Sequence, residues 1–233
     1  MMDATNSTQT ARRSRLARLL ALGGIVGPIV FIAAFTIAGA IRPGYSPIHR
    51  AISALGTGAT GWQEDVPALI LGVMLLCFTA SFVLLMRTVM AKTSLVLSTI
   101  LLTVFALVWI TVAIFTSAPA TVGIHTIASI VGEIAVLVAF VLVGSALRKA
   151  PGWRGWSAYS LIAGAVTLII LVVTYIAARP SIPASLRLGG LTERIMVIEI
   201  LIWFVAFGWK LFRTPAHVFL NGEQDARTTQ PAG

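Results

Sequence analysis

Three side chains in this sequence are of types that can do chemistry together: a serine, a histidine and a glutamate. Ser53 lies in a loop between two apolar runs, whereas His125 and Glu133 lie in a later apolar run. Ser53 or a bound water would act as the nucleophile, His125 as its base or as a metal ligand, and Glu133 as the group that orients the histidine. This set suits the hydrolysis of a lipid, so these three are the candidate catalytic residues.

No tight catalytic or metal-binding motif accompanies these residues. The sequence has no His-Glu-x-x-His and no Gly-x-Ser-x-Gly segment. A zinc site that used His49 and His125 would need carboxylates to complete it. The sequence therefore leaves metal binding and catalysis open. It also has no phosphate-binding P-loop, and we expect no cofactor.

The composition places these residues in a membrane protein. The chain is 58% hydrophobic and only 11% charged, whereas soluble domains carry about 25% charged residues. A membrane-crossing helix needs about 20 apolar residues. We therefore predict an all-α fold, a six-span helical bundle. The six stretches that qualify are 19–41, 66–86, 94–115, 122–147, 156–178 and 191–211.

The ends of the chain differ from the membrane domain, which we place at 19–212. Residues 1–18 form a basic tail, and residues 213–233 form a polar tail that we expect to be disordered. The first apolar run has 23 residues, which is too long for the apolar region of an ordinary signal peptide. We therefore expect it to be an uncleaved first span.

The basic residues predict the orientation of the bundle. The net charge of +9 does not indicate nucleic-acid binding, because the basic residues stand at the ends of apolar runs. Of the 17 Lys and Arg residues, twelve fall on the side of the two termini and five on the other side. By the positive-inside rule, both termini are cytoplasmic and the loop 42–65 faces outward. We expect a multi-pass protein of the plasma membrane.

The first outer loop has a helical pattern of its own. Ser46 suits an N-cap, and Pro47 suits the first helical position. Apolar side chains then recur at helical spacing until the glycines that follow Leu55. We predict a short amphipathic helix of about two and a half turns at the membrane surface, with His49 and Ser53 on one face.

Polar residues within the spans predict a shared cavity. His125, Ser129 and Glu133 are spaced by four, so they form one stripe of the fourth span. Charged side chains inside a membrane are costly and mark functional sites. All these residues lie in the predicted outer half of the bundle, where the first loop also lies. The predicted lining of an outward-facing cavity is His49, Ser53, His125, Ser129, Glu133, Glu193, Arg194 and Glu199. The alternative is that the glutamates only tie helices together through hydrogen bonds.

Several segments resemble one membrane family. They are Tyr45-Ser46-Pro47, Ile52-Ser53-Ala54-Leu55-Gly56, His125 at the start of the fourth span, and Gly190-Leu191-Thr192-Glu193-Arg194 at the start of the sixth. From about Leu19 to Phe212 the chain resembles the family called domain of unknown function 998. The resemblance implies a bacterial or archaeal six-helix integral membrane protein without a settled activity. It also implies that Ser53, His125, Glu193 and Arg194 are the positions to test.

Three functions fit these observations. The first is a protein that binds or moves a small or lipidic molecule, for which a homodimer would relieve the small number of spans. The second is a membrane assembly subunit whose polar residues organise the bundle. The third, ranked after both, is a membrane-embedded lipid hydrolase that uses Ser53 and His125. The expected partners are the lipid bilayer and a small-molecule or lipid ligand, with homo-oligomerisation left open and no nucleic acid.

Overall fold

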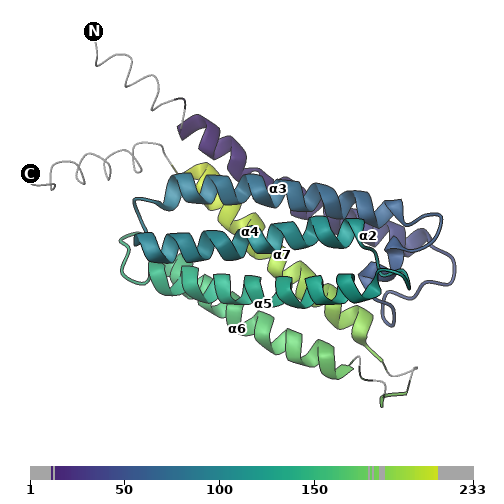
Figure 1. Ribbon diagram of the computed structural model, residues 1–233. Helices are drawn as coiled ribbons and strands as arrows, with labels where there is room; N and C mark the ends of the chain where they lie inside the picture. The colour runs from purple at the N-terminus through teal and green to yellow at the C-terminus, as the bar shows by residue number, and fades with distance from the viewer. Residues whose placement is uncertain (1–11, 13, 178, 180, 184–186, 215–233) are drawn as a thin grey trace, which may run out of the picture.

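The computed structural model describes residues 12, 14–177, 179, 181–183 and 187–214, and this part of the chain is helical without a β-strand. Six of its helices are long and apolar enough to cross a membrane, so the predicted six-span bundle is confirmed. The helices, shown in Figure 1, are α2 (Gly23–Ile41), η1 (Ile52–Gly56), α3 (Trp62–Met86), α4 (Lys92–Ile114), α5 (Val122–Leu147), α6 (Arg154–Ala177) and α7 (Gly189–Arg213).

The first span begins earlier than the sequence predicts. Helical structure runs from Ser14 to Ile41, with a turn at Leu22 that separates a short first segment from α2. Part of the predicted N-terminal tail therefore belongs to this span. Residues 1–11 and 215–233 of the two predicted tails lie outside the described residues.

The six spans form a closed ring. Each helix packs against the next one in the sequence, and α7 completes the ring by packing against α2. In Figure 1, α7 runs diagonally behind α4 and α5. Glycines allow close approach at the α2 contact with α3: a Cβ atom on Gly27 would lie 2.7 Å from Met74 Cβ, and one on Gly23 would overlap the Met74 backbone. This is the small-residue packing that is typical of membrane helices.

An aromatic cluster fills one half of the ring. Trp203, Phe204 and Phe207, from the second half of α7, are fully buried. The ring centroids of Trp203 and Phe207 are 4.7 Å apart, and those of Phe140 and Trp203 are 4.5 Å apart. The indole N–H of Trp203 donates to Ser160 Oγ at 3.0 Å, so its polar atom is satisfied. Apolar area and edge-to-face contacts therefore hold α7 to α3, α4 and α5 in this half.

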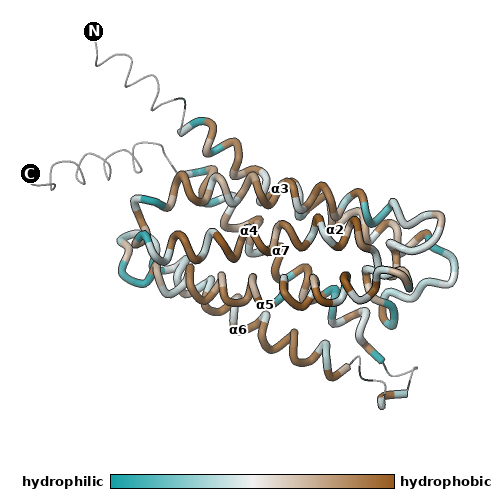
Figure 2. Tube along the Cα trace, viewed as in Figure 1, coloured by the Kyte–Doolittle hydropathy of each residue, from teal (hydrophilic) through white to brown (hydrophobic). Residues whose placement is uncertain are grey.

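The outer surface of the bundle is apolar along the middle of the helices. Figure 2 shows hydrophobic residues along the helices and hydrophilic residues gathered at the two ends. Large side chains such as Ile127, Ile134, Ile162 and Ile169 are more than half exposed. Helices satisfy their own backbone hydrogen bonds, so such a surface suits contact with hydrocarbon.

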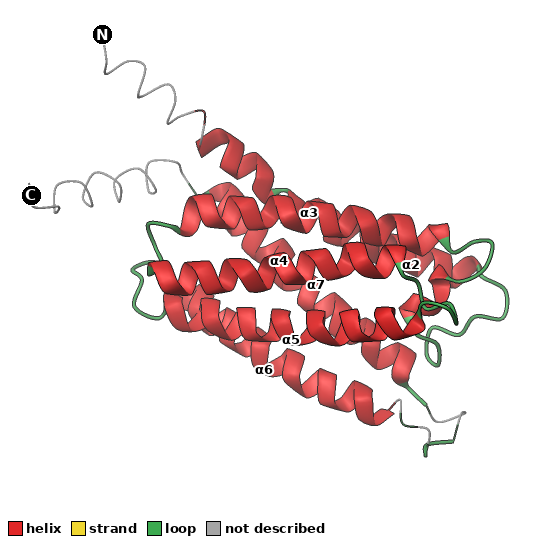
Figure 3. Cartoon of the chain, in the orientation of Figure 1, coloured by secondary structure: helices red, strands yellow, loops and turns green. Residues whose placement is uncertain are grey.

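The connections lie at the two ends of the ring (Figure 3). The first loop, residues 42–61, and the loop 115–121 lie at one end, which we call the loop end. In the first loop the predicted helix of two and a half turns is wrong. A single turn, closed by Arg50 N–H donating to Ser46 O at 2.9 Å, is followed by the separate 3-10 helix η1.

The contact with α7 explains why the longer helix does not form. In a continuous helix, the N–H of Ile52 would donate to the carbonyl of Ile48. Instead Ile48 O accepts from Leu191 N–H at 3.0 Å, and Ile52 N–H donates to Glu193 Oε2 at 3.1 Å. Tertiary hydrogen bonds thus replace the helical one, and His49 and Ser53 do not share a helical face.

Candidate ligand-binding cavity

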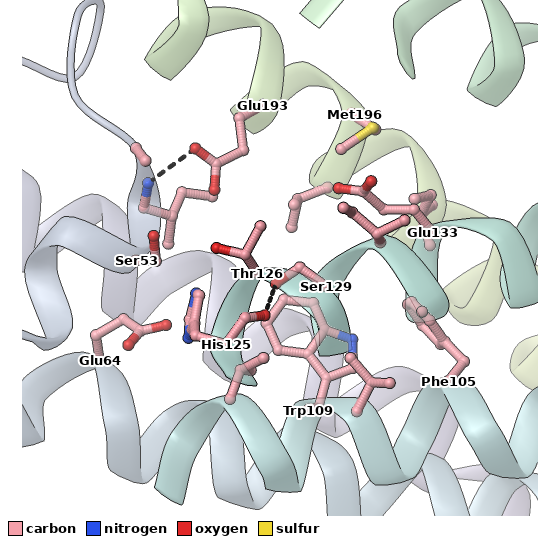
Figure 4. A pocket seen from close by; sticks show the side chains of 18 of the residues that line it. Ser53, Glu64, Phe105, Trp109, His125, Thr126, Ser129, Glu133, Glu193 and Met196 are labelled. Carbon is pink, nitrogen blue, oxygen red and sulfur yellow. Dashed lines mark hydrogen bonds between the residues drawn. The ribbon is translucent and has the colours of Figure 1, made fainter. Parts of the chain in front are cut away.

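A cavity of about 250 Å³ occupies the ring interior at the loop end (Figure 4). This volume is just below the range of roughly 300 to 1,000 Å³ that is usual for ligand pockets, so it suits a small molecule or the headgroup of a lipid. The polar side chains that line it are Ser53, Glu64, His125, Thr126, Ser129, Glu133, Tyr175 and Glu193. Its apolar lining consists mainly of Phe105, Val108, Trp109, Val112, Met196, Val197 and Ile200.

The start of α7 positions the first loop over the cavity. Glu193 holds the N–H of Ile52 and itself lines the cavity (Figure 4). A Cβ atom on Gly190 would lie 2.7 Å from the carbonyl carbon of Arg50 and 2.8 Å from its nitrogen. Only a glycine at position 190 therefore lets the loop approach α7 this closely. The first loop therefore binds to the segment Gly190-Leu191-Thr192-Glu193-Arg194 at the start of α7.

Two arginines fasten the same loop from outside the cavity. Arg194 Nη1 donates to the carbonyls of Pro47, Arg50 and Gly190 at 2.8 to 2.9 Å, and its Nη2 donates to the Tyr45 hydroxyl. Arg42 donates to the carbonyls of three residues, 54, 55 and 57, at the end of η1. These three carbonyls have no hydrogen-bond donor within the helix. The guanidinium of Arg42 has several N–H groups and supplies the missing hydrogen bonds.

The neutral hydroxyl of Tyr45 also takes part in the hydrogen bonds that hold the first loop in place. Burial raises the pKa of the Tyr45 hydroxyl above its ordinary value of 10.0, an effect that the neighbouring Arg194 only partly opposes. The hydroxyl therefore keeps its proton at neutral pH, and it donates that proton to Ala51 O at 2.8 Å. The Tyr45-Ser46-Pro47 segment thus acts in loop docking rather than in the cavity.

His125 enters the cavity from the first turns of α5. Its Nδ1 lies 2.9 Å from the carbonyl of Phe115. A carbonyl only accepts, so Nδ1 carries a proton and donates it to Phe115 O. Ser129 donates to the carbonyl of His125 at 2.9 Å. Figure 4 shows Ser53, Glu64 and His125 at the same end of the cavity.

The structure does not join Ser53 and His125 as a catalytic pair. The carbonyl of Ser53 accepts from Ser117 Oγ at 2.8 Å. Among the described residues, no hydrogen bond links Ser53 Oγ to His125 or to a carboxylate. A serine nucleophile needs a base within about 2.6 to 3.2 Å, so this geometry does not support activation of Ser53.

Glu64 is a cavity residue that the sequence reasoning missed. It stands in the first turn of α3, where acidic residues usually complement the helix dipole at a solvated end. Here Glu64 is only 6% exposed and lines the cavity. A Cβ atom on Gly56 would lie 2.6 Å from Glu64 Oε2 and 2.5 Å from Asp65 Oδ1. The two carboxyl groups therefore lie against the backbone of Gly56, which no pattern within α3 predicts.

Five of the eight residues predicted for the cavity line it, and three do not. Glu133 lines it and accepts from the Tyr175 hydroxyl at 3.1 Å. His49 is an exposed residue of the first loop, with Nδ1 2.7 Å from the carbonyl of Arg187, and Arg194 binds the first loop. Glu199 instead accepts from Thr167 Oγ1 at 2.7 Å, between α6 and α7.

The position of Glu199 has a helical reason. The cavity-facing residues of α7 are Glu193, Met196, Val197 and Ile200, at spacings of three, four and seven. Glu199 is six residues from Glu193, so it lies on another face of the helix. For Glu199, the alternative that it ties two helices together is the one that the structure supports.

Two other potential sites find no support in the geometry. Among the described residues, no group of three or more His, Cys, Asp and Glu side chains is placed to hold a metal ion. The spacing Gly56-x-Gly58-x-x-Gly61 matches that of dinucleotide-binding loops, which follow a β-strand. Here it follows η1 and leads into α3, and Gly61 packs against the Gly56 backbone.

Comparison with known proteins gives one match. A family model described as "Protein of unknown function (DUF998)" matches residues 25–210. The chain has no significant match among curated proteins or among solved structures. The matched range contains every residue that lines the cavity and every contact that docks the first loop. The chain therefore belongs to the DUF998 family of proteins of unknown function.

Proposed function

We propose that this protein binds a small molecule or the headgroup of a lipid in the cavity at the loop end, and that it does so within a membrane. The observation that carries the proposal is the contrast between the two halves of the ring. Aromatic side chains fill one half, whereas about 250 Å³ at the other half is open and lined by Glu64, Glu133 and Glu193.

The cost of this arrangement favours binding over a purely structural role. Carboxyl groups in an apolar surrounding destabilise a fold unless they are paired. A subunit that served only in assembly would be more stable with this space filled by apolar side chains. A hydrolase has less support, because no base among the residues that the structure describes is hydrogen-bonded to Ser53 Oγ.

The charge distribution supports an outward-facing cavity in the plasma membrane, with both termini in the cytoplasm. The first loop, which covers the cavity, belongs to the side of the bundle with five of the 17 basic residues. By the positive-inside rule, the side with few basic residues faces away from the cytoplasm. The ligand would then enter from outside or from the outer leaflet.

A cavity-filling substitution tests the proposal. Ser129→Phe places a large ring in the cavity, and Ser145→Phe, on the exposed face of the same helix, is the matched control. Each protein is purified in neutral detergent, extracted with organic solvent and analysed by mass spectrometry. We expect a compound that co-purifies with wild type and with Ser145→Phe but is lost from Ser129→Phe. Identical extracts from all three proteins would contradict ligand binding in this cavity.

A further inference from the structure

The lining of the cavity indicates which chemical class of ligand it takes. Building on the proposed function, we infer that the ligand carries an ammonium group on a short hydrocarbon stem. The inference depends on three properties of the lining: its carboxyl groups, its excess of hydrogen-bond acceptors and its apolar wall.

The lining is rich in carboxyl groups and poor in basic side chains. Glu64, Glu133 and Glu193 contribute carboxyl groups, whereas among the described residues His125 is its one basic side chain and no Lys or Arg lines the cavity. Two arginines at the same end of the bundle are engaged elsewhere, since Arg42 and Arg194 donate to loop carbonyls and to Tyr45. A cationic ligand would supply a counter-charge that no Lys or Arg of the described residues provides in the cavity.

Three hydrogen-bond donors of the lining are already used, whereas the indole N–H of Trp109 is buried without a hydrogen-bond partner. Ser129 donates to the carbonyl of His125, and Tyr175 donates to Glu133. His125 donates through Nδ1 to Phe115 O. The carboxyl groups of Glu64, Glu133 and Glu193 add acceptor oxygens, so the lining presents more acceptors than free donors. An ammonium group has three donors and no acceptor, which is the complementary pattern.

Glu64 and Asp65 form a pair of adjacent carboxyl groups at the cavity. The side chain of Glu64 is 6% exposed, lines the cavity and is hydrogen-bonded to the side chain of Asp65. Its closest carboxyl neighbour is Asp65, whose Oδ1 is buried without a hydrogen-bond partner. Two adjacent carboxyl groups repel each other when ionised, and a bound cation relieves that repulsion.

The apolar wall suits the stem and the aromatic face of Trp109 suits the cation. Phe105, Val108, Met196 and Ile200 contribute apolar side chains to the lining, whose carboxyl groups come from α3, α5 and α7. An ammonium group near the face of an indole ring gains a further cation–π attraction. The volume of about 250 Å³ equals that of roughly eight water molecules, so the stem must be short or must leave the cavity.

Three probes of equal length but different charge test the inference. Hexylamine, hexan-1-ol and hexanoate are titrated into the full chain in neutral detergent at neutral pH, and binding is followed by Tm and by tryptophan fluorescence. We expect hexylamine to bind at least about tenfold more tightly than the other two. Glu64→Gln and Glu133→Gln should each weaken hexylamine binding about tenfold, because each removes a charge-assisted hydrogen bond to the ammonium group.

The control variant is Glu199→Gln, which makes the same change on a carboxyl group outside the cavity. It should leave hexylamine binding unchanged. If hexanol or hexanoate binds as tightly as hexylamine, and Ser129→Phe removes that binding, the cavity binds ligands but the ammonium inference is wrong. If Ser129→Phe and Ser145→Phe bind all three probes as wild type does, both the inference and the proposed function are wrong.

A comparison of two lipids in the same experiment distinguishes the two possible sources of the ammonium group, a lipid headgroup and a free amine. Lysophosphatidylethanolamine, which carries an ammonium headgroup, is compared with the anionic lysophosphatidylglycerol. Stabilisation by hexylamine and by the ammonium lipid supports an aminolipid headgroup as the ligand. Stabilisation by hexylamine alone supports a free amine. Equal stabilisation by both lipids that Ser129→Phe abolishes would overturn the ammonium inference.

Discussion

At the scale of single residues, the first loop and the cavity depend on Gly190. The backbone of Arg50 lies where the Cβ atom of any other residue at this position would stand. Three hydrogen bonds depend on this close approach: Leu191 N–H donates to Ile48 O, Ile52 N–H donates to Glu193 Oε2, and Arg194 donates to Arg50 O. Even a single methyl group at position 190 would push the first loop away from α7.

Gly190→Ala should therefore destabilise the protein, although alanine is the better helix former. Overpacking of this kind costs about 1 to 3 kcal/mol, which corresponds to a fall in Tm of several degrees. The matched control is Gly123→Ala in α5, where a Cβ atom meets nothing within 4 Å. The Tm of each variant in neutral detergent, together with limited proteolysis of the first loop, measures the effect. Equal Tm values for the two variants would contradict the docking described for Gly190.

At the scale of elements, α7 has different tasks along its length. Its first half docks the loop and lines the cavity through Glu193, Met196 and Val197. Its second half inserts Trp203, Phe204 and Phe207 into the ring, where each is fully buried. The aromatic half anchors the helix, so the loop end is able to remain hollow without loss of the bundle.

Phe204→Ala should lower stability more than most single changes in this chain. Phe204 contacts Phe78 and stacks on Phe105, with centroids 5.2 Å and 5.5 Å away. Loss of a buried phenylalanine costs about 3 to 5 kcal/mol, or about 10 °C in Tm for a domain of this size. Ile202→Ala, on the exposed face of the same helix, should change Tm little. Equal losses for Phe204→Ala and Ile202→Ala would show that the aromatic cluster does not anchor α7.

At the scale of the whole molecule, the two ends of the ring differ in charge. The turns 87–92 and 148–154, at the end opposite the first loop, contain Arg87, Lys92, Arg148, Lys149 and Arg154. The first loop contains two basic residues, both arginine, and one of them, Arg42, is bound to loop carbonyls. The positive-inside rule predicts that the loop end lies outside the cell.

Cysteine labelling of intact cells tests this orientation. The single native cysteine is first removed with Cys77→Ser. Ala59→Cys in the first loop should then react with a membrane-impermeant maleimide, because residue 59 is exposed at the loop end. Lys149→Cys, exposed at the other end, should react only after the membrane is permeabilised. The reverse labelling pattern would place the cavity on the cytoplasmic side.

The sequence by itself determined the features that depend on local composition and periodicity. Six apolar runs of about 20 residues must become helices in hydrocarbon, because nothing else there satisfies the backbone. The spacing of His125, Ser129 and Glu133 likewise placed these residues on one helical face, and all three line the cavity. These predictions needed no knowledge of which helices are neighbours.

Only the tertiary structure decided the features that depend on contacts far apart in the sequence. Residues 48 and 52 have a helical pattern, but α7 takes the hydrogen bonds that a helix there would use. By its position in the first turn of α3, Glu64 is expected to be solvated, but η1 covers it. Glu199 accepts a hydrogen bond from Thr167 of α6 and does not line the cavity. Local propensities differ by only about 1 kcal/mol per residue. A few long-range hydrogen bonds of similar strength therefore outweigh them, and those bonds exist only once the ring has closed.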